Sequence, residues 1–441
     1  MARSNRGRYR WQALVAAALL LPVPVLAIAP PVVAQVYGSP TGAYRQGVER
    51  FAVGDYDGAI AAFSQALSFD PSDYEAYNYL GRSLYKTGDL SGAIVAYELA
   101  LDIRPEYADV YNNLGVAQRA GGNLSEAIAS YERAIELNPS LAPPHYNLAL
   151  VAVEDDRREE AEAHLRDAID ADRRFAPAYR SLGELKLSQQ DYRSAASLLG
   201  TAIDLNPNLD DTYGDLGLAL VRLNRYDEAL PVLLMALDRT GDRRADVHYA
   251  YGLLLAATND LESAILSQEQ ALKIDNTDPS YWVALGDALR ITGERDRAQT
   301  AYASALDLVE RRSDLPSADL ARVYFSLGDY YADEGRTAIA INSYQNAIDT
   351  APDFPLGYVG MADMFVELGE YRSANEYYQQ AIDLDPDSPI VYTRLGLLLY
   401  DEGETERAID AWRTAIELDP NYSEAYVHLG NALANRPVQR R

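Results

Sequence analysis

The stretch that decides the fold is ADVYNNLGVAQRAGGNLSEAIASYERAIELNPSL, residues 108–141. Its first part places an aromatic residue, Leu and Gly at positions 4, 7 and 8, and its second part places Ala, Tyr and Ala at positions 20, 24 and 27. Both sets follow the period of an α-helix, so each part predicts a helix with one apolar face. Pro139 ends the second helix, because proline offers no N–H and clashes with the preceding turn. The stretch therefore predicts a helix-turn-helix unit.

The same pattern returns along almost the whole chain at a spacing of 34 residues. Its Leu-Gly pair recurs at Leu80-Gly81, Leu182-Gly183, Leu216-Gly217, Leu285-Gly286, Leu327-Gly328, Leu395-Gly396 and Leu429-Gly430. Neither helix of one unit can bury its apolar face alone, so the units are expected to stack. Because Gly and Ala lack bulk, we expect the helix axes to approach at the short end of the roughly 8–10 Å range.

This pattern resembles the tetratricopeptide repeat (TPR). Eleven full repeats cover 40–422, and a terminal capping helix is expected at 423–435. The repeats begin at residues 40, 74, 108, 142, 176, 210, 245, 279, 321, 355 and 389. The resemblance implies an all-α, right-handed superhelical solenoid whose inner surface is made by the first helices of the repeats.

Three irregularities depart from the repeat pattern. One extra residue precedes the repeat at 245, and an eight-residue insertion lies near 310–320. The insertion is expected to lengthen a second helix and to add a loop containing Pro316. Repeat four matches least well, with Ala149 in place of Gly and Arg173 in place of Pro.

The N-terminus resembles a secretory signal peptide. Basic residues precede an apolar run from Ala13 to Ala29, which is broken by two prolines. The run is short and interrupted for a membrane-spanning helix. We therefore expect residues 1–34 to be a signal peptide cleaved before Gln35, with an uncleaved N-terminal membrane anchor as the alternative. The protein is expected to be exported, to the periplasm or another extracytoplasmic space.

The remaining ends of the chain are short. Residues 35–39 are expected to form a linker, and the basic tail 436–441 is expected to be disordered. The chain contains no Cys, which excludes disulfides and thiol chemistry.

The composition is strongly acidic. The chain has 66 Asp and Glu residues against 39 Lys and Arg, a formal net charge of −27. Such a surface repels phosphate backbones and anionic lipid, so it argues against nucleic acid as a partner. Basic protein segments or cations are favoured instead. A membrane partner is expected only if the N-terminal segment stays uncleaved.

The sequence shows no constellation typical of catalysis. His145 and His248 occupy the aromatic fourth position of their repeats and are predicted to be core residues, and no two histidines have the i, i+4 spacing of a zinc site. No P-loop, dinucleotide-binding glycine motif or nucleophile-elbow motif is present. Many tyrosines fall on motif positions that are expected to be buried. We therefore predict no enzyme activity, no cofactor and no metal site.

The inner face of the first helices is the predicted place for a partner. In the first repeats it carries Asn78, Arg82, Asn112, Asn113, Arg119 and Asn147. Asn offers both a donor and an acceptor, so a row of asparagines can bond the backbone of an extended peptide whatever its side chains. This row resembles the asparagine ladder of the TPR superhelix in protein O-linked N-acetylglucosamine transferases. Ordinary solvated polar side chains are the alternative interpretation. The Lys and Asn clamp that binds chaperone C-termini is absent.

Later repeats turn acidic at the same face. Position nine holds Asp287, Asp329 and Asp363 in three consecutive repeats. Neighbouring first helices are expected about 9–10 Å apart, so one shared metal ion is not predicted. A row of separated charges suits a basic peptide segment, with an attraction that weakens as salt rises.

These observations predict a non-catalytic scaffold or assembly factor outside the cytoplasm. It would hold an extended or helical segment of a client protein in the concave TPR groove. Two alternatives remain open: a divalent-cation carrier or chaperone that uses the acidic surface, and the targeting subunit of a multi-chain enzyme.

Overall fold

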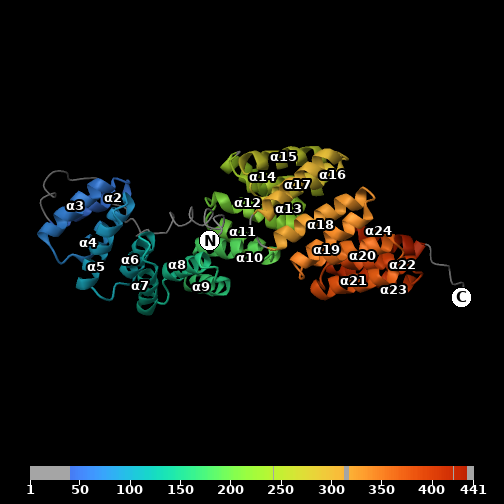
Figure 1. Ribbon diagram of the computed structural model, residues 1–441. Helices are drawn as coiled ribbons and strands as arrows, with labels where there is room; N and C mark the ends of the chain where they lie inside the picture. Colours follow the sequence, from blue (N-terminus) through green and yellow to red (C-terminus); the bar gives the residue numbers. More distant parts are fainter. Residues whose placement is uncertain (1–39, 242, 312–316, 421, 435–441) are drawn as a thin grey trace. The chain divides into compact units, whose positions relative to one another are not determined.

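The computed structural model describes residues 40–241, 243–311, 317–420 and 422–434 (Figure 1). These residues form 23 α-helices and contain no strand, so the prediction of an all-α fold is confirmed. Within these ranges, no helix combines the length and the apolar character needed to cross a membrane. The predicted signal peptide, the linker 35–39, Pro316 and the basic tail lie outside the described residues.

First and second helices alternate along the chain. The first helices are α2 (Pro40–Ala52), α4 (Tyr74–Thr87), α6 (Ala108–Ala120), α8 (Ala142–Glu154), α10 (Ala176–Ser188), α12 (Asp210–Arg222), α14 (Ala245–Ala257), α16 (Pro279–Ile291), α18 (Ser317–Asp333), α20 (Pro355–Glu367), α22 (Pro389–Asp401) and α24 (Ser423–Ala434). The second helices are α3 (Tyr56–Phe69), α5 (Leu90–Ile103), α7 (Leu124–Leu137), α9 (Arg158–Ala171), α11 (Tyr192–Leu205), α13 (Tyr226–Thr240), α15 (Leu261–Ile274), α17 (Arg295–Glu310), α19 (Thr337–Thr350), α21 (Tyr371–Leu384) and α23 (Thr405–Leu418).

Almost every first helix begins at the residue where the 34-residue spacing starts a repeat. The difference is α18, which begins at Ser317, four residues before position 321. The insertion near 310–320 is therefore partly helical on both sides, because α17 also extends to 16 residues. Within the range that the structure describes, the insertion lengthens two helices rather than one.

Local caps set the helix ends. Asp89 precedes α5, and its side chain accepts a hydrogen bond from the backbone N–H of Gly92 at 2.9 Å. This bond satisfies one of the N–H groups that a helix start leaves unpaired. The preceding turn uses Gly88, whose φ of 89° is a left-handed conformation that glycine adopts without strain.

The helices fall into two compact units, 40–225 and 226–434. Inside each unit every helix packs against the next one in sequence. First helices also contact the following first helix, as α2, α4, α6 and α8 do in one unit and as α14 to α24 do in the other. The first helices of unit 226–434 therefore form a continuous face, and α2, α4, α6 and α8 form one in unit 40–225.

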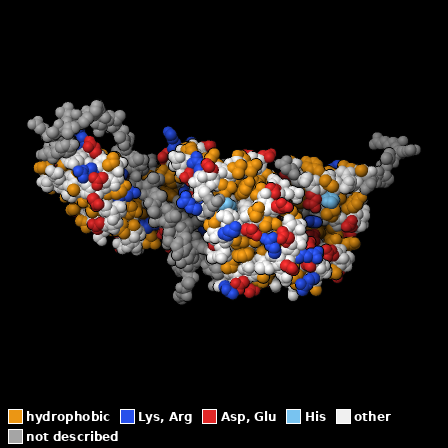
Figure 2. Space-filling model, turned by 90° about the horizontal axis from the view of Figure 1, so that it is seen from above, with side chains coloured by type: hydrophobic (Ala, Val, Ile, Leu, Met, Phe, Trp, Pro, Cys, Tyr) orange, Lys and Arg blue, Asp and Glu red, His pale blue; other side chains and the backbone are white. Residues whose placement is uncertain are grey.

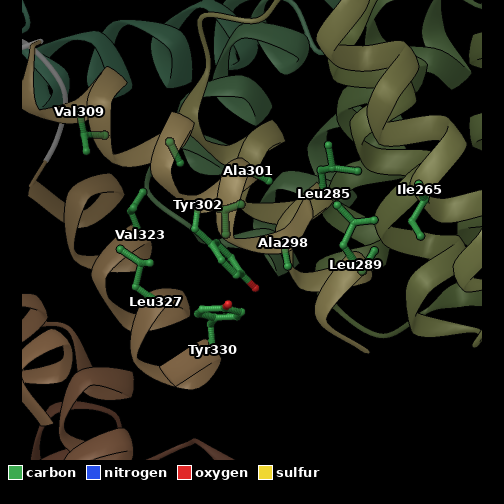
Figure 3. Packing of buried hydrophobic residues seen from close by; sticks show 13 residues of the cluster. Ile265, Leu285, Leu289, Ala298, Ala301, Tyr302, Val309, Val323, Leu327 and Tyr330 are labelled. Carbon is green, nitrogen blue, oxygen red and sulfur yellow. The ribbon is translucent and has the colours of Figure 1, made fainter. Parts of the chain in front are cut away.

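The small residues of the motif allow the two helices of one repeat to pack closely. A Cβ atom added to Gly286 of α16 would lie 2.6 Å from the ring of Tyr302 of α17. Tyr302 is fully buried, and its ring lies 5.7 Å from that of Tyr330 in the next first helix (Figure 3). The prediction that motif tyrosines are core residues holds at this position, and the same close approach joins Gly81 to Tyr97 and Gly328 to Tyr344.

Candidate protein-binding face

The asparagines of the first repeats form a row across three first helices. The side-chain amide of Asn113 on α6 donates to Oδ1 of Asn78 on α4 at 3.1 Å. Asn147 on α8 donates in the same way to Oδ1 of Asn112 on α6 at 2.9 Å. Each pair links position five of one repeat to position six of the next. The row predicted from sequence is therefore present, with bonds between neighbouring repeats.

The expectation that this row is open to a peptide backbone needs correction. All four asparagines are buried, and Asn112 has 0% of its surface exposed. The two bonds within the row use one polar group of each asparagine, which favours this arrangement because a buried amide without a partner is costly. The Nδ2 group of Asn112 is buried and has no hydrogen-bond partner among the described residues.

The two arginines of the predicted site are also held inside the fold. The guanidinium of Arg82 lies over the rings of Phe51 and Tyr79, 4.7 and 4.8 Å from their centres. Arg119 of α6 forms an ion pair of 2.6 Å with Glu154 of α8, and their side chains are 6% and 34% exposed. Both arginines therefore have partners in the fold before any client binds.

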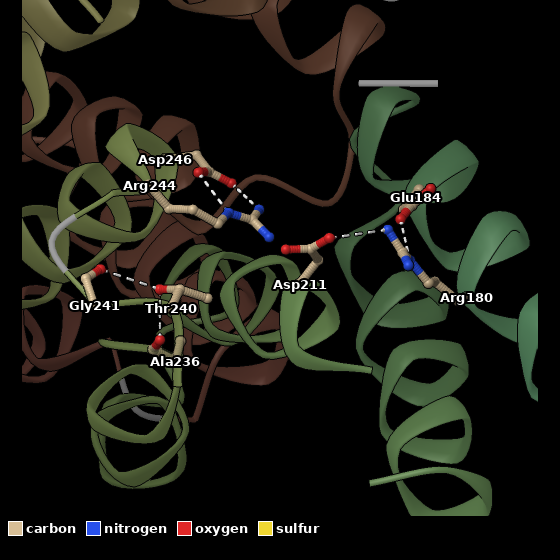
Figure 4. Close-up of polar contacts among 8 residues, drawn as sticks. All are labelled: Arg180, Glu184, Asp211, Ala236, Thr240, Gly241, Arg244 and Asp246. Atoms are coloured by element: carbon tan, nitrogen blue, oxygen red, sulfur yellow. Dashed lines mark hydrogen bonds and ion pairs between the residues drawn. The ribbon is translucent and has the colours of Figure 1, made fainter. Parts of the chain in front are cut away.

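Charged pairs between neighbouring first helices are a general feature of this face. Arg119 and Glu154 occupy positions twelve and thirteen of consecutive repeats, and Arg290 and Asp333 pair at the same two positions in the other unit. In Figure 4, Arg180 of α10 donates to Glu184 at 2.7 Å and lies 3.8 Å from Asp211 of α12.

A second close-up pair in Figure 4 joins Arg244 to Asp246 at the start of α14. Acidic and basic side chains are also interspersed on the face seen in Figure 2. Several charged side chains of the first helices therefore have a partner of opposite charge in the fold, although the net balance of the sequence is acidic.

The three aspartates of the later repeats lie on α16, α18 and α20. Each accepts a hydrogen bond from the tyrosine hydroxyl of its own second helix: Tyr302 to Asp287 at 2.7 Å, Tyr344 to Asp329 at 2.7 Å, and Tyr378 to Asp363. In every pair the tyrosine follows the aspartate by fifteen residues. The sequence carried this signal, because these three repeats combine Asp at position nine with Tyr at position 24.

Burial changes the acidity of these aspartates. It raises the pKa of Asp329 to about 6, and the pKa values of Asp287 and Asp363 are raised by the same cause. The hydroxyl bonds act in the opposite direction, because they stabilise the ionised form. Positive charge is also close, since Arg394 lies 3.9 Å from Asp363. The three carboxyl groups are therefore half-buried, and each is tied to a tyrosine hydroxyl of its own repeat.

Repeat four contains a cluster that the sequence analysis missed. One ligand atom each from His145 on α8 and from His164 and Asp167 on α9 lie within 4.8 Å of one another. The search for i, i+4 histidine pairs could not find it, because the histidines come from different helices. The detectable signal was the i, i+3 spacing of His164 and Asp167, which places both on one side of α9.

The comparisons with known proteins agree on one family. Models described as "Tetratricopeptide repeat" match residues 44–108, 215–279, 108–141 and 321–354, and a model described as "TPR repeat" matches 362–403 and 396–435. Together these ranges span more than half of the chain. No curated protein matches it.

Several solved structures resemble the chain. Yeast Tom70 is 17% identical with a TM-score of 0.45, over 90% of this chain and 95% of that one. TTC0263, a thermophilic TPR protein of Thermus thermophilus, is 28% identical with a TM-score of 0.36, over 42% of this chain and 100% of that one. YrrB, described as a TPR protein with an unusual peptide-binding site, is 24% identical with a TM-score of 0.38, over 42% and 95%. With family models matched along more than half of the chain, this protein belongs to the tetratricopeptide repeat family, which supports a protein–protein interaction scaffold.

Proposed function

We propose that this protein is a scaffold or assembly factor that works outside the cytoplasm and binds a basic segment of a client protein. The segment, extended or helical, lies along the first helices of unit 226–434. The observation that carries the proposal is the row of Asp287, Asp329 and Asp363 on three consecutive first helices, each bonded to a buried tyrosine.

The electrostatics of this row favour a cationic partner. A raised pKa means that the folded protein compensates the ionised carboxylate less well than water does. A Lys or Arg side chain placed beside the row supplies the missing compensation and stabilises the ionised form. At positions 2, 5, 6, 9, 12 and 13 of the first helices of this unit, which are expected to face the groove, three arginines stand against eight carboxylates. The carboxylates are Asp246, Asp287, Asp329, Asp333, Asp363, Glu367, Asp401 and Glu424. The tyrosine hydroxyls hold each acceptor in place, so little ordering is required on binding.

A peptide fits this row better than a shared cation does. Among the described residues, the only group of His, Asp and Glu side chains compact enough for a metal ion is the one in repeat four. The three aspartates come from three first helices, and neighbouring first helices are expected about 9–10 Å apart. The ligands of one calcium ion, in contrast, each lie roughly 2.3–2.6 Å from it. A segment that runs across successive helices can place one cation beside each carboxylate.

The extracytoplasmic setting rests on the N-terminal sequence. Basic residues followed by the apolar run from Ala13 to Ala29 have the parts of a secretory signal peptide. The absence of Cys from the sequence is compatible with an oxidising compartment.

The test uses a library of 15-residue peptides with basic, acidic and neutral members, measured by fluorescence anisotropy against the chain from residue 35 onward. We expect basic peptides to bind, with an affinity that falls as salt rises. The triple variant Asp287→Asn, Asp329→Asn and Asp363→Asn should weaken this binding most at low ionic strength.

The matched control removes three charges elsewhere on the same unit. Asp307, Asp383 and Asp410 lie exposed on the second helices α17, α21 and α23, and their Asn variants should leave the affinity nearly unchanged. Equal losses in both triple variants would indicate a general effect of net charge rather than this face. Equal binding of acidic, neutral and basic peptides would refute the proposal.

Two other functions are distinguished by separate measurements. Stoichiometric micromolar binding of Ca²⁺ or Mn²⁺ in calorimetry, abolished by the triple variant, would favour a cation carrier. Co-purification with an enzyme from an envelope extract, at a surface that the triple variant leaves intact, would favour a targeting subunit.

A further inference from the structure

The side chains of His145, His164 and Asp167 converge between the two helices of repeat four. Nδ1 of His145 lies 4.0 Å from Oδ2 of Asp167. His164 is one turn before Asp167 on α9, and a ring nitrogen of His164 completes the group within 4.8 Å. Glu160, four residues before His164, adds a carboxylate oxygen 3.8 Å from its Nε2. Nitrogen and oxygen donors from two packed helices are therefore aimed at one small volume.

The hydrogen bond of the His145 imidazole leaves a nitrogen lone pair available. Nε2 of His145 lies 3.3 Å from the backbone carbonyl oxygen of Pro139. Because a carbonyl only accepts, Nε2 carries the proton in this bond, and Nδ1 keeps a lone pair that faces Asp167. Metal-binding histidines commonly have their second nitrogen held in this way.

The second imidazole is not satisfied by the fold. Nδ1 of His164 is buried and has no hydrogen-bond partner in the part of the chain that the structure describes. Its Nε2 lies 3.8 Å from Oε1 of Glu160, which is too long for a hydrogen bond. A buried ring nitrogen without a hydrogen-bond partner costs free energy. A cation bound in this cluster would lie beside the His164 ring and change the surroundings of that nitrogen.

We propose that His145, His164 and Asp167 bind a zinc ion that ties α8 to α9. Two imidazoles and one carboxylate form a donor set that suits zinc, with water or Glu160 in the fourth position. Zinc–nitrogen distances of about 2.0–2.1 Å place tetrahedral ligand atoms roughly 3.3 Å apart. The three atoms need to close by an ångström or so from their present spacing. Side-chain rotation supplies this movement, since Asp167 is exposed and both imidazoles are partly exposed.

The position of the site gives it a structural role. Repeat four has Ala149 where most other repeats have Gly, Leu165 where many have Tyr, and Arg173 where many have Pro. An ion bound between α8 and α9 would stabilise the helix pair that departs furthest from the repeat pattern. Binding to the folded state alone raises stability in proportion to the logarithm of ligand concentration over Kd.

The test is calorimetric titration of the tag-free, chelator-treated chain with Zn²⁺, together with the visible absorption of the Co²⁺-substituted protein. We expect one site, cobalt bands typical of low coordination number, and a thermal midpoint that rises with zinc. His145→Gln, His164→Gln and Asp167→Asn should each weaken zinc binding by about 100-fold or more, since loss of an outer partner alone costs 10- to 100-fold.

His428 provides the matched control. It lies on α24 with Glu424 four residues earlier and 3.8 Å away, the same arrangement as His164 and Glu160, but without a second histidine. His428→Gln should leave zinc affinity and the zinc-dependent rise in melting temperature unchanged.

The outcomes separate clearly. Zinc affinity that is equal in wild type and in the three cluster variants, or that falls only in His428→Gln, would overturn the proposal. A cluster variant that fails to fold is replaced by Asp167→Asn, whose side chain is exposed and whose substitution leaves the core intact. Absence of binding by the wild-type chain would also overturn it.

Discussion

Replacing Gly286 by Ala places a methyl group where the fold has no room. The new Cβ would lie 2.6 Å from Cε1 of Tyr302 and 2.8 Å from its Cδ1, whereas non-bonded carbons are best separated by about 3.5–4.0 Å. Tyr302 cannot rotate away at low cost, because its ring is fully buried and its hydroxyl donates to Asp287 at 2.7 Å.

The expected magnitude follows from two opposing terms. Overpacking costs about 1–3 kcal/mol, and Ala gains about 1 kcal/mol over Gly in a helix interior. The net destabilisation of Gly286→Ala is therefore about 0–2 kcal/mol, and that of Gly286→Leu is larger. Gly200 of α11 is the control, since an added Cβ there has no heavy atom within 4 Å. Gly200→Ala should stabilise by about 0.5–1 kcal/mol.

The assay is urea unfolding followed by circular dichroism, with hydrogen exchange on α16 and α17 because a repeat array can open in parts. Repeat four suggests a compensating change, since it combines Ala149 with Leu165. Gly286→Ala with Tyr302→Leu should cost less than the sum of the single changes, by about 0.5–3 kcal/mol. If both glycine variants shift the midpoint in the same direction, the packing argument is refuted.

Three further predictions concern other parts of the chain. Asn147→Leu should destabilise the protein by about 1–3 kcal/mol, because it leaves both polar groups of the buried Asn112 side chain without a hydrogen-bond partner. The double variant Asn112→Leu and Asn147→Leu should be nearly neutral in urea unfolding. The raised pKa of Asp329, about 6 against an ordinary 3.8, means that its stabilising proton is lost as pH rises through about 4 to 6. The urea unfolding midpoint of the wild type should therefore rise relative to that of Asp329→Asn as the pH is lowered from 7 to 4. A difference between the two midpoints that stays constant with pH would contradict this. N-terminal sequencing of the exported protein should give Gln35, whereas Met1 or Ala2 on membrane-bound material would favour an anchor.

The sequence by itself determined the repeat register and the helical fold. Residues such as Gly115, Ala127 and Tyr131 define where two helices meet, because only small residues admit an aromatic ring between helix axes. This information is local and recurs every 34 residues, so each copy supports the others. The start of α18 at Ser317 departs from the 34-residue register, because the insertion has no counterpart in the other repeats.

Only the tertiary structure decided which polar side chains of the inner face bond to one another. Asn78 bonds to Asn113, and Arg119 to Glu154, at a separation of 35 residues, one more than the repeat. A row of polar positions in sequence does not reveal whether they face solvent or one another. That depends on the distance between neighbouring first helices, which is set by packing across repeats.

The two candidate sites, the aspartate row and the histidine cluster of repeat four, also differ in how far the sequence predicts them. Asp329 and Tyr344 belong to one repeat, so their pairing was readable in principle from a fixed spacing of fifteen residues. His145 and His164 have no periodic signal, and their approach depends on the antiparallel packing of α8 against α9. Sequence patterns specify which faces are buried, whereas the convergence of unlike side chains from two helices is fixed only when those helices pack.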